Sequence, residues 1–139
     1  MSPRAQNAAP RHRVLIVDDE ESTRLLIARL LSRGMKVEAQ LAGTCEQALR
    51  LARNYAYDAI LLDLLMPGMG GLELLRAIRR SSANMATPVL VVSMLADDVT
   101  VERCRAAGAD AHLAKPVEDR RLLAAVKKLL AERGKSRIS

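Results

Sequence analysis

The chain has no phenylalanine and no tryptophan, and its only aromatic side chains are Tyr55 and Tyr57. Its 139 residues are enough for one domain with a real core, which must be built from aliphatic side chains and methionine. Proteins that bind single-stranded nucleic acid without sequence preference stack the bases on aromatic side chains. The lack of such side chains argues against that class of binder.

Cysteine is scarce as well. Cys45 and Cys104 are far apart in the sequence and form no CxxC or mixed Cys/His pattern, so a zinc site or a redox motif is not expected. Two reduced thiols are typical of a cytoplasmic protein. The N-terminus has no apolar segment of the signal-peptide kind, and Asp63 and Pro67 interrupt the longest apolar run. The sequence therefore predicts a cytoplasmic protein without a membrane span.

The net charge of +6 lies at the two ends of the chain. Of 22 basic residues, six lie outside residues 14–132: Arg4, Arg11, Arg13, Arg133, Lys135 and Arg137. All 16 acidic residues lie inside that range, so the body of the chain is neutral. We expect a disordered basic lead over 1–12, one domain over 13–132 and a basic tail over 133–139. Such tails are usually solubilising or linker segments, and contact with nucleic acid or an acidic partner is the alternative.

Short apolar runs alternate with amphipathic segments along the domain. Leu26, Ile27 and Leu30 are expected to face the core from the first helix, and Thr44 to cap the second. Strands are predicted at 14–17, 36–41, 59–62, 89–92 and 111–113, and helices at 22–33, 45–54, 72–80, 97–107 and 118–132. This alternation predicts a doubly wound parallel sheet covered on both faces, with its ligand site at the carboxyl ends of the strands.

A carboxylate, Asp63, is embedded in the apolar run Ala59-Ile60-Leu61-Leu62-Asp63-Leu64-Leu65-Met66-Pro67. A buried charge of this kind is costly unless another group pairs with it. Polar side chains also stand at the ends of three other predicted strands: Asp18 and Asp19, Ser93, and Lys115. Because the carboxyl ends of parallel strands meet at one edge of a sheet, we expect these five residues to lie close together.

This set of side chains suits a divalent cation and a phosphoryl group. Hard carboxylate oxygens at an open edge are typical ligands of Mg²⁺ or Mn²⁺. Asp63 is the best candidate for attack on phosphorus, because it leaves a central apolar strand while Asp18 and Asp19 sit together as a pair. Lys115 would contact a phosphoryl oxygen and Ser93 would donate a hydrogen bond. A cis peptide bond between Lys115 and the following proline would aim the ammonium inward. In the alternative interpretation, the aspartate pair only caps the first helix.

The runs Val17-Asp18-Asp19-Glu20 and Asp63-Leu64-Leu65-Met66-Pro67, with Ser93 and Lys115-Pro116, resemble in order and spacing the signature of receiver domains of two-component response regulators. The resemblance covers about residues 13–132. It implies a flavodoxin-like (βα)5 fold with strand order 2-1-3-4-5. It also implies phosphorylation of Asp63 by the phosphohistidine of a histidine kinase or phosphotransfer protein. The metal, Mg²⁺ or Mn²⁺, would be held by Asp18, Asp19, Asp63 and the backbone carbonyl of Leu65.

The chain departs from the pattern of these receivers at four positions. Met94 stands where a small residue is usual and could narrow access to Asp63. Leu65 and Leu95 occupy positions where many relatives carry polar residues that guide the hydrolytic water, so we expect a long-lived phosphoryl group. His112 stands where tyrosine or phenylalanine is usual. It is either the residue that, with Ser93, switches the surface in response to phosphorylation, or a half-exposed strand histidine without a role.

The resemblance implies a signalling domain that catalyses its own phosphorylation and dephosphorylation, and not an enzyme with a separate substrate. The expected docking or dimer surface is formed by the helix 97–107, the strand 111–113 and the helix 118–132. No DNA-binding domain is expected in this chain, so a stand-alone receiver and a piece of a longer regulator both remain open. Two rivals are a constitutive interaction module and a phosphatase, but related hydrolases carry an aspartate where this chain has Leu65.

Overall fold

Strands and helices alternate strictly along the chain. The computed structural model describes residues 11–66, 70–81 and 83–138, except for the side chains of Ser81 and of 133–138. The elements are β1 (His12–Val17), α2 (Glu21–Gly34), β2 (Val37–Ala42), α3 (Cys45–Asn54), β3 (Ala59–Leu62), α4 (Gly71–Ser81), β4 (Val89–Ser93), α5 (Asp98–Ala107), β5 (Ala111–Ala114) and α6 (Asp119–Ile138). The five strands form one parallel sheet in the order β2-β1-β3-β4-β5, which confirms the predicted topology.

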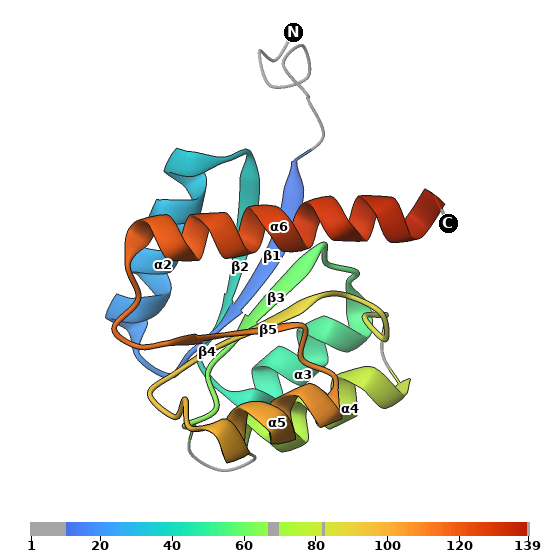
Figure 1. Cartoon of the computed structure of the whole chain (residues 1–139). Coiled ribbons are helices and arrows are strands. Elements are labelled where there is room, and N and C mark those ends of the chain that lie inside the picture. The colour runs from blue at the N-terminus through green and yellow to red at the C-terminus, as the bar shows by residue number, and fades with distance from the viewer. Residues whose placement is uncertain (1–10, 67–69, 82, 139) are drawn as a thin grey trace, which may run out of the picture.

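Helices cover both faces of this sheet. Helices α2 and α6 pack on one face, and α3, α4 and α5 pack on the other (Figure 1). Side chains of a strand alternate between the two layers, so Leu15 and Val17 of β1 join one core while Val14 and Ile16 join the other. Because every residue of β3 and β4 is buried, these strands are the continuous apolar runs that a sheet covered on both faces requires.

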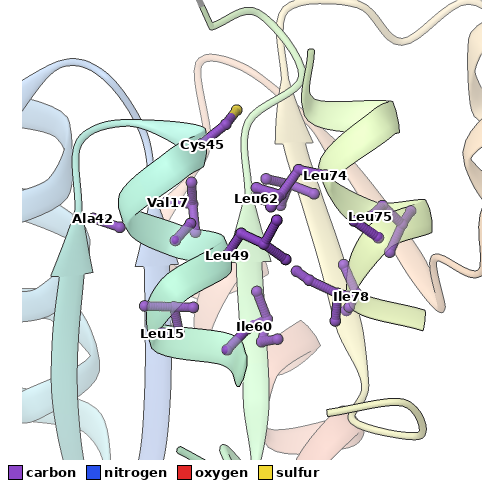
Figure 2. Packing of buried hydrophobic residues seen from close by; sticks show 14 of the residues in the cluster. Leu15, Val17, Ala42, Cys45, Leu49, Ile60, Leu62, Leu74, Leu75 and Ile78 are labelled. Carbon is purple, nitrogen blue, oxygen red and sulfur yellow. The ribbon is translucent and has the colours of Figure 1, made fainter. Parts of the chain in front are cut away.

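The core on the α3–α4 side is mostly aliphatic, as expected, but it also contains buried Tyr57, Cys45 and Cys104, which the expectation of an aliphatic and methionine core left out. Leu49 of α3 and Ile78 of α4 extend toward the side of β3 that carries Ile60, and Leu74 of α4 lies beside Leu62 (Figure 2). Burying each such side chain contributes about 1.5–3 kcal/mol. The packing fixes α3 and α4 against the strands whose ends carry Asp18 and Asp63.

The cap predicted at Thr44 is confirmed, whereas the start of α5 differs from the prediction. The hydroxyl of Thr44 accepts a hydrogen bond from the backbone N–H of Gln47 at the start of α3. Asp97, which the sequence placed inside the fourth predicted helix, instead caps α5 from outside by accepting from the N–H of Thr100. Gly108 ends α5 with φ of 112°, a left-handed conformation that favours glycine.

One predicted core residue is wrong. Ile27 and Leu31 are the buried residues of α2, whereas Leu26 is 54% exposed. Leu30 is only partly buried against the same core. Residues four apart lie on one helix face, and the face that α2 turns to the sheet is centred on Ile27 and Leu31. Leu26 lies about 100° around the helix from Ile27 and therefore leaves the core.

Two element ends differ from the sequence prediction by more than one residue. Strand β1 begins at His12, because its edge pairs with β2 through the register His12↔Val37. Helix α6 runs to Ile138, beyond the expected end at Glu132, so the helix includes most of the expected basic tail. Residues 1–10 of the expected lead over 1–12, and the loop residues 67–69, lie outside the described residues. No helix in the described part of the chain is long and apolar enough to cross a membrane.

A buried amide network fixes the amino end of β4, far from the carboxyl edge of the sheet. The side-chain nitrogen of Asn84 donates to the carbonyl oxygens of Ala52 and Tyr55, at 2.7 and 2.8 Å. Its side-chain oxygen accepts from the backbone N–H of Tyr57 at 2.7 Å. Asparagine in a loop ordinarily indicates only a turn, so nothing in the sequence predicts this network.

Candidate functional site

The site lies where the strand order of the sheet reverses. Strand β1 connects through α2 to β2 on one side of it, whereas β3 connects through α4 to β4 on the other side, so the connections after β1 and β3 leave on opposite faces of the sheet. Val17 and Leu62, the last residues of β1 and β3, are register partners, and the N–H of Asp63 donates to the carbonyl of Val17 at 3.0 Å. Asp18 and Asp63 are therefore held side by side at the switch point, where ligands bind in doubly wound folds.

Three carboxylates converge at this point. Carboxylate oxygens of Asp18, Asp19 and Asp63 all lie within 4.8 Å of one another. Asp18 is 2% and Asp63 5% exposed, while Asp19 faces solvent. Two buried carboxylates beside a third, open one make an all-oxygen donor set that fits a small hard cation such as Mg²⁺. Such a cation also needs several waters or ligand oxygens, and the exposed side at Asp19 leaves room for them.

Lys115 neutralises part of this negative charge. Its Nζ atom lies 2.8 Å from Oδ2 of Asp18 and 3.1 Å from Oδ2 of Asp63, and its side chain is 17% exposed. Burial by itself would lower the pKa of Lys115, but its hydrogen bonds and ion pairs with both aspartates outweigh burial and raise that pKa above its usual value. The peptide bond from Lys115 to Pro116 is cis, as the sequence analysis proposed.

Backbone donors fix the orientation of the two buried carboxylates. Oδ1 of Asp18 accepts from the N–H of Glu20 at 2.9 Å, and Oδ1 of Asp63 accepts from the N–H of Leu65 at 3.2 Å. In each carboxylate the other oxygen contacts Lys115. The two side chains are thus held in matching arrangements, with one oxygen on the backbone and one on the shared ammonium.

Ser93, at the end of β4, lies next to this group through the backbone. The N–H of Lys115 donates to the carbonyl of Ser93 at 3.0 Å. The Ser93 side chain is fully buried, and its hydroxyl oxygen accepts from the N–H of Leu95 at 3.2 Å. The hydroxyl donates to no acceptor in the part of the chain that the structure describes. The two hydrogen bonds together connect Ser93 to Lys115 and to the loop that follows β4.

His112 contacts the same loop from the neighbouring strand. Its Nε2 atom lies 2.8 Å from the carbonyl oxygen of Leu95. Since a carbonyl can only accept, Nε2 carries the hydrogen and donates it. The Nδ1 atom is buried and has no hydrogen-bond partner among the described residues. This contact links β5 to the loop after β4, and both interpretations of His112 stay predictions.

An apolar cavity of about 400 Å³ adjoins the acidic cluster. It is lined by Thr23, Leu26, Ile27, Val92, Met94, Lys115, Pro116 and Val117. Met94 is 73% exposed at its mouth, and its expected effect on access to Asp63 stays a prediction. Leu65 and Leu95, which follow Asp63 and Ser93 by two residues at this edge of the sheet, are 48% and 40% exposed.

One contact at the site involves a residue that no sequence pattern above predicts. Nη1 of Arg24, in α2, donates to the backbone carbonyl of Asp18 at 2.6 Å. The positive end of a helix dipole disfavours a cation near the start of a helix. Arg24 is the fourth residue of α2, where a positive charge is unfavourable unless a specific group pairs with it. This unfavourable position was the signal in the sequence that could have indicated a partner for Arg24.

Fold and site together define a flavodoxin-like α/β domain with an acidic pocket and a lysine at its switch point. A family model, the response regulator receiver domain, matches residues 14–127. The chain belongs to this family, which consists of signalling modules of two-component systems. Asp18, Asp19 and Asp63, which the resemblance names as metal ligands, form one acidic cluster, and their role as ligands stays a prediction.

Two curated relatives are longer than this chain. It is 40% identical over 114 residues to the sensory/regulatory protein RpfC of Xanthomonas campestris. The aligned segment covers 80% of this chain and 15% of that protein. It is 33% identical over 117 residues to the DNA-binding response regulator MtrA of Mycobacterium tuberculosis. Here the aligned segment covers 84% of this chain and 50% of that protein. The chain thus spans half or less of these relatives.

Solved structures match nearly end to end. A CheY-like receiver domain protein from Methanospirillum hungatei has a TM-score of 0.85 at 29% identity, covering 91% of this chain and 99% of that one. The chemotaxis protein CheY4 of Vibrio cholerae has a TM-score of 0.81 at 29% identity, covering 86% and 99%. The similarity therefore extends over most of the fold.

Proposed function

We propose that Asp63 is a phosphoacceptor that takes a phosphoryl group from the phosphohistidine of a histidine kinase or phosphotransfer protein. The observation that carries this proposal is the shared ammonium of Lys115, 2.8 Å from Asp18 and 3.1 Å from Asp63. It places a fixed positive charge beside a buried carboxylate at the ligand edge of the sheet. A phosphoryl group on Asp63 would bring new negative charge next to that ammonium.

In the transfer, a carboxylate oxygen of Asp63 forms a bond to phosphorus while the bond from phosphorus to the donor imidazole nitrogen breaks. Lys115 then pairs with a phosphoryl oxygen, and the hydroxyl of Ser93 donates to another. Asp18, Asp19, Asp63 and the backbone carbonyl of Leu65 would hold Mg²⁺, with Mn²⁺ as a substitute. When bound, the cation neutralises charge on the phosphoryl oxygens.

The same contacts suggest how phosphorylation reaches the surface. Ser93 accepts from the N–H of Leu95, and His112 donates to the carbonyl of Leu95. A Ser93 hydroxyl drawn toward a phosphoryl oxygen would shift the loop that His112 contacts. We propose that the α5–β5–α6 face changes in response and binds a downstream protein or a second copy of the chain.

The domain would also end its own signal by hydrolysis of the aspartyl phosphate. Exposed Leu65 and Leu95 stand beside the site and offer no side-chain hydrogen bond to an attacking water. We therefore propose slow hydrolysis and a long-lived phosphorylated state.

The test is intact-mass analysis after incubation with acetyl phosphate, with Mg²⁺ or with a chelator. Wild type is compared with Asp63→Asn and with Asp98→Asn, which removes an exposed carboxylate at the start of α5. We expect one phosphate adduct that requires Mg²⁺ and Asp63 and survives in the Asp98→Asn protein. A wild-type chain that stays unmodified by both acetyl phosphate and a phosphorylated histidine kinase would contradict the proposal and favour a constitutive interaction module.

A further inference from the structure

We propose that Arg24 is a positioning residue for the metal site, acting through the backbone of Asp18. Nη1 of Arg24 lies 2.6 Å from the Asp18 carbonyl oxygen, a short charge-assisted hydrogen bond. Asp18 is 2% exposed, so its place in the pocket is set by the groups that contact it. The inference takes from the proposed function only that the cation bound here is Mg²⁺.

The guanidinium of Arg24 lies directly against Gly43. A Cβ atom added to Gly43 would lie 2.9 Å from Nη1 and 3.3 Å from Cζ of Arg24. Gly43 lies in the connection between β2 and α3, while Asp18 lies in the connection between β1 and α2. Arg24 therefore joins two neighbouring loops at the carboxyl edge of the sheet, and the absence of a side chain at Gly43 makes room for it.

Arg24 matters most when Lys115 changes partners. Three donors hold Asp18: Lys115 on Oδ2, the N–H of Glu20 on Oδ1, and Arg24 on the backbone carbonyl. A cation held by the carboxylates would compete with Lys115 for Asp18, and a phosphoryl group on Asp63 would later compete with Asp18 for Lys115. Glu20 and Arg24 are then the two donors that still fix Asp18.

Simple electrostatics and positioning predict opposite results when Arg24 is replaced. Removing a positive charge near three carboxylates should strengthen the binding of a cation if charge alone matters. Losing a group that orients a metal ligand weakens metal binding, typically by about 10- to 100-fold. The sign of the change in Mg²⁺ affinity therefore separates the two.

The experiment is a Mg²⁺ titration of the unphosphorylated protein, followed by calorimetry and by amide NMR shifts of Asp19, Asp63 and Leu65. We expect Arg24→Met to raise the Kd for Mg²⁺ by about tenfold. Arg29→Met, which removes an exposed arginine from the same helix, should leave Kd unchanged within about twofold.

Gly43→Ala provides a second test that keeps the charge of Arg24. The added methyl group displaces the guanidinium, which is the flexible end of a side chain, and should raise Kd by about two- to fivefold. Circular dichroism shows that each variant is folded before titration. If one variant unfolds, the other decides.

Equal or tighter Mg²⁺ binding by Arg24→Met and Gly43→Ala would overturn the inference and leave the proposed phosphoacceptor function intact. If both variants bind Mg²⁺ more weakly than wild type, the inference is supported. If at the same time no donor phosphorylates the wild-type chain, the proposed phosphoacceptor function is contradicted. A wild-type chain that binds no Mg²⁺ would overturn both.

Discussion

The ammonium of Lys115 lies 3.1 Å from the carboxylate of Asp63 although β4 separates their two strands in the sheet. The lysine side chain therefore reaches across the end of β4 to the centre of the acidic pocket. There it also contacts Asp18, so one cation serves two buried carboxylates. The charge of the pocket depends on this single side chain as long as no metal is bound.

Replacing Lys115 with methionine should destabilise the metal-free protein. Asp18 and Asp63 would lose their shared partner and repel each other, at a cost of about 1–3 kcal/mol in the free energy of unfolding. Added Mg²⁺ should restore much of the loss, because the cation takes over the neutralising role. Urea unfolding with and without Mg²⁺ measures both effects, and Lys127→Met, on the exposed side of α6, is the control. A loss that Mg²⁺ leaves unchanged would show that Lys115 acts through packing alone.

The contribution of Lys115 to stability should depend on pH in the alkaline range only. Its pKa is raised in the folded protein because the carboxylates outweigh the effect of burial. A group with a raised pKa stabilises the fold fully below its unfolded pKa, about 10.4, and loses this contribution as the pH rises through the folded value. The difference in unfolding free energy between wild type and Lys115→Met should stay constant from about pH 7 to about pH 9. A steady decline across that range would contradict the raised pKa.

Gly71→Ala should damage the site, whereas Gly70→Ala should not. A Cβ atom at Gly71 would lie 2.5 Å from the backbone oxygen of Asp63 and 2.7 Å from Cα of Leu64. Because both are backbone atoms, only a shift of the backbone can relieve the clash. Nothing lies within 4 Å of a Cβ atom at Gly70. We expect a loss of about 1–3 kcal/mol in unfolding free energy for Gly71→Ala, together with slower phosphorylation. Thermal unfolding and adduct formation test this, and equal behaviour of the two variants would argue against it.

Leu65→Asn should shorten the lifetime of the phosphorylated state. An amide at this exposed position could hydrogen-bond an attacking water, and about 1 kcal/mol of such stabilisation changes the rate by about fivefold. The decay of the phosphate adduct after removal of the donor gives the half-life, with Leu25→Asn on the exposed part of α2 as the control. A wild-type half-life of seconds would contradict the premise that the leucines slow hydrolysis.

Phosphorylation should shift the ring resonances of His112. The ring donates to the Leu95 carbonyl, in the loop that Ser93 also contacts. His112→Gln keeps a donor and should preserve the response of α5 and α6 amides, while His112→Phe should weaken it. NMR spectra before and after phosphorylation measure these changes. Unmoved His112 resonances would support the interpretation of a strand histidine without a role.

Most of the topology could be predicted because each buried strand is a short apolar run and each helix has its own periodicity. Asp63 could be singled out because burying a carboxylate inside an apolar run is unfavourable unless another group pairs with it. The core-facing residues of α2 could be predicted only in part. Leu26 and Ile27 are adjacent and both apolar, and only the packing of α2 on the sheet decides that Ile27 is buried and Leu26 is exposed. Arg24 and Asn84 could not be assigned roles, because their partners are backbone carbonyls, which no sequence pattern displays.

The sequence by itself determined which residues could do chemistry: carboxylates, a hydroxyl and an ammonium at the ends of apolar strands, in a family-typical order. Only the tertiary structure decided how these groups are arranged. Distances such as those from Lys115 to Asp18 and Asp63 result from strand order and register, which join segments 97 and 52 residues apart. Local propensity acts over a few residues, whereas the partners of a buried charge are chosen by the packing of the whole sheet.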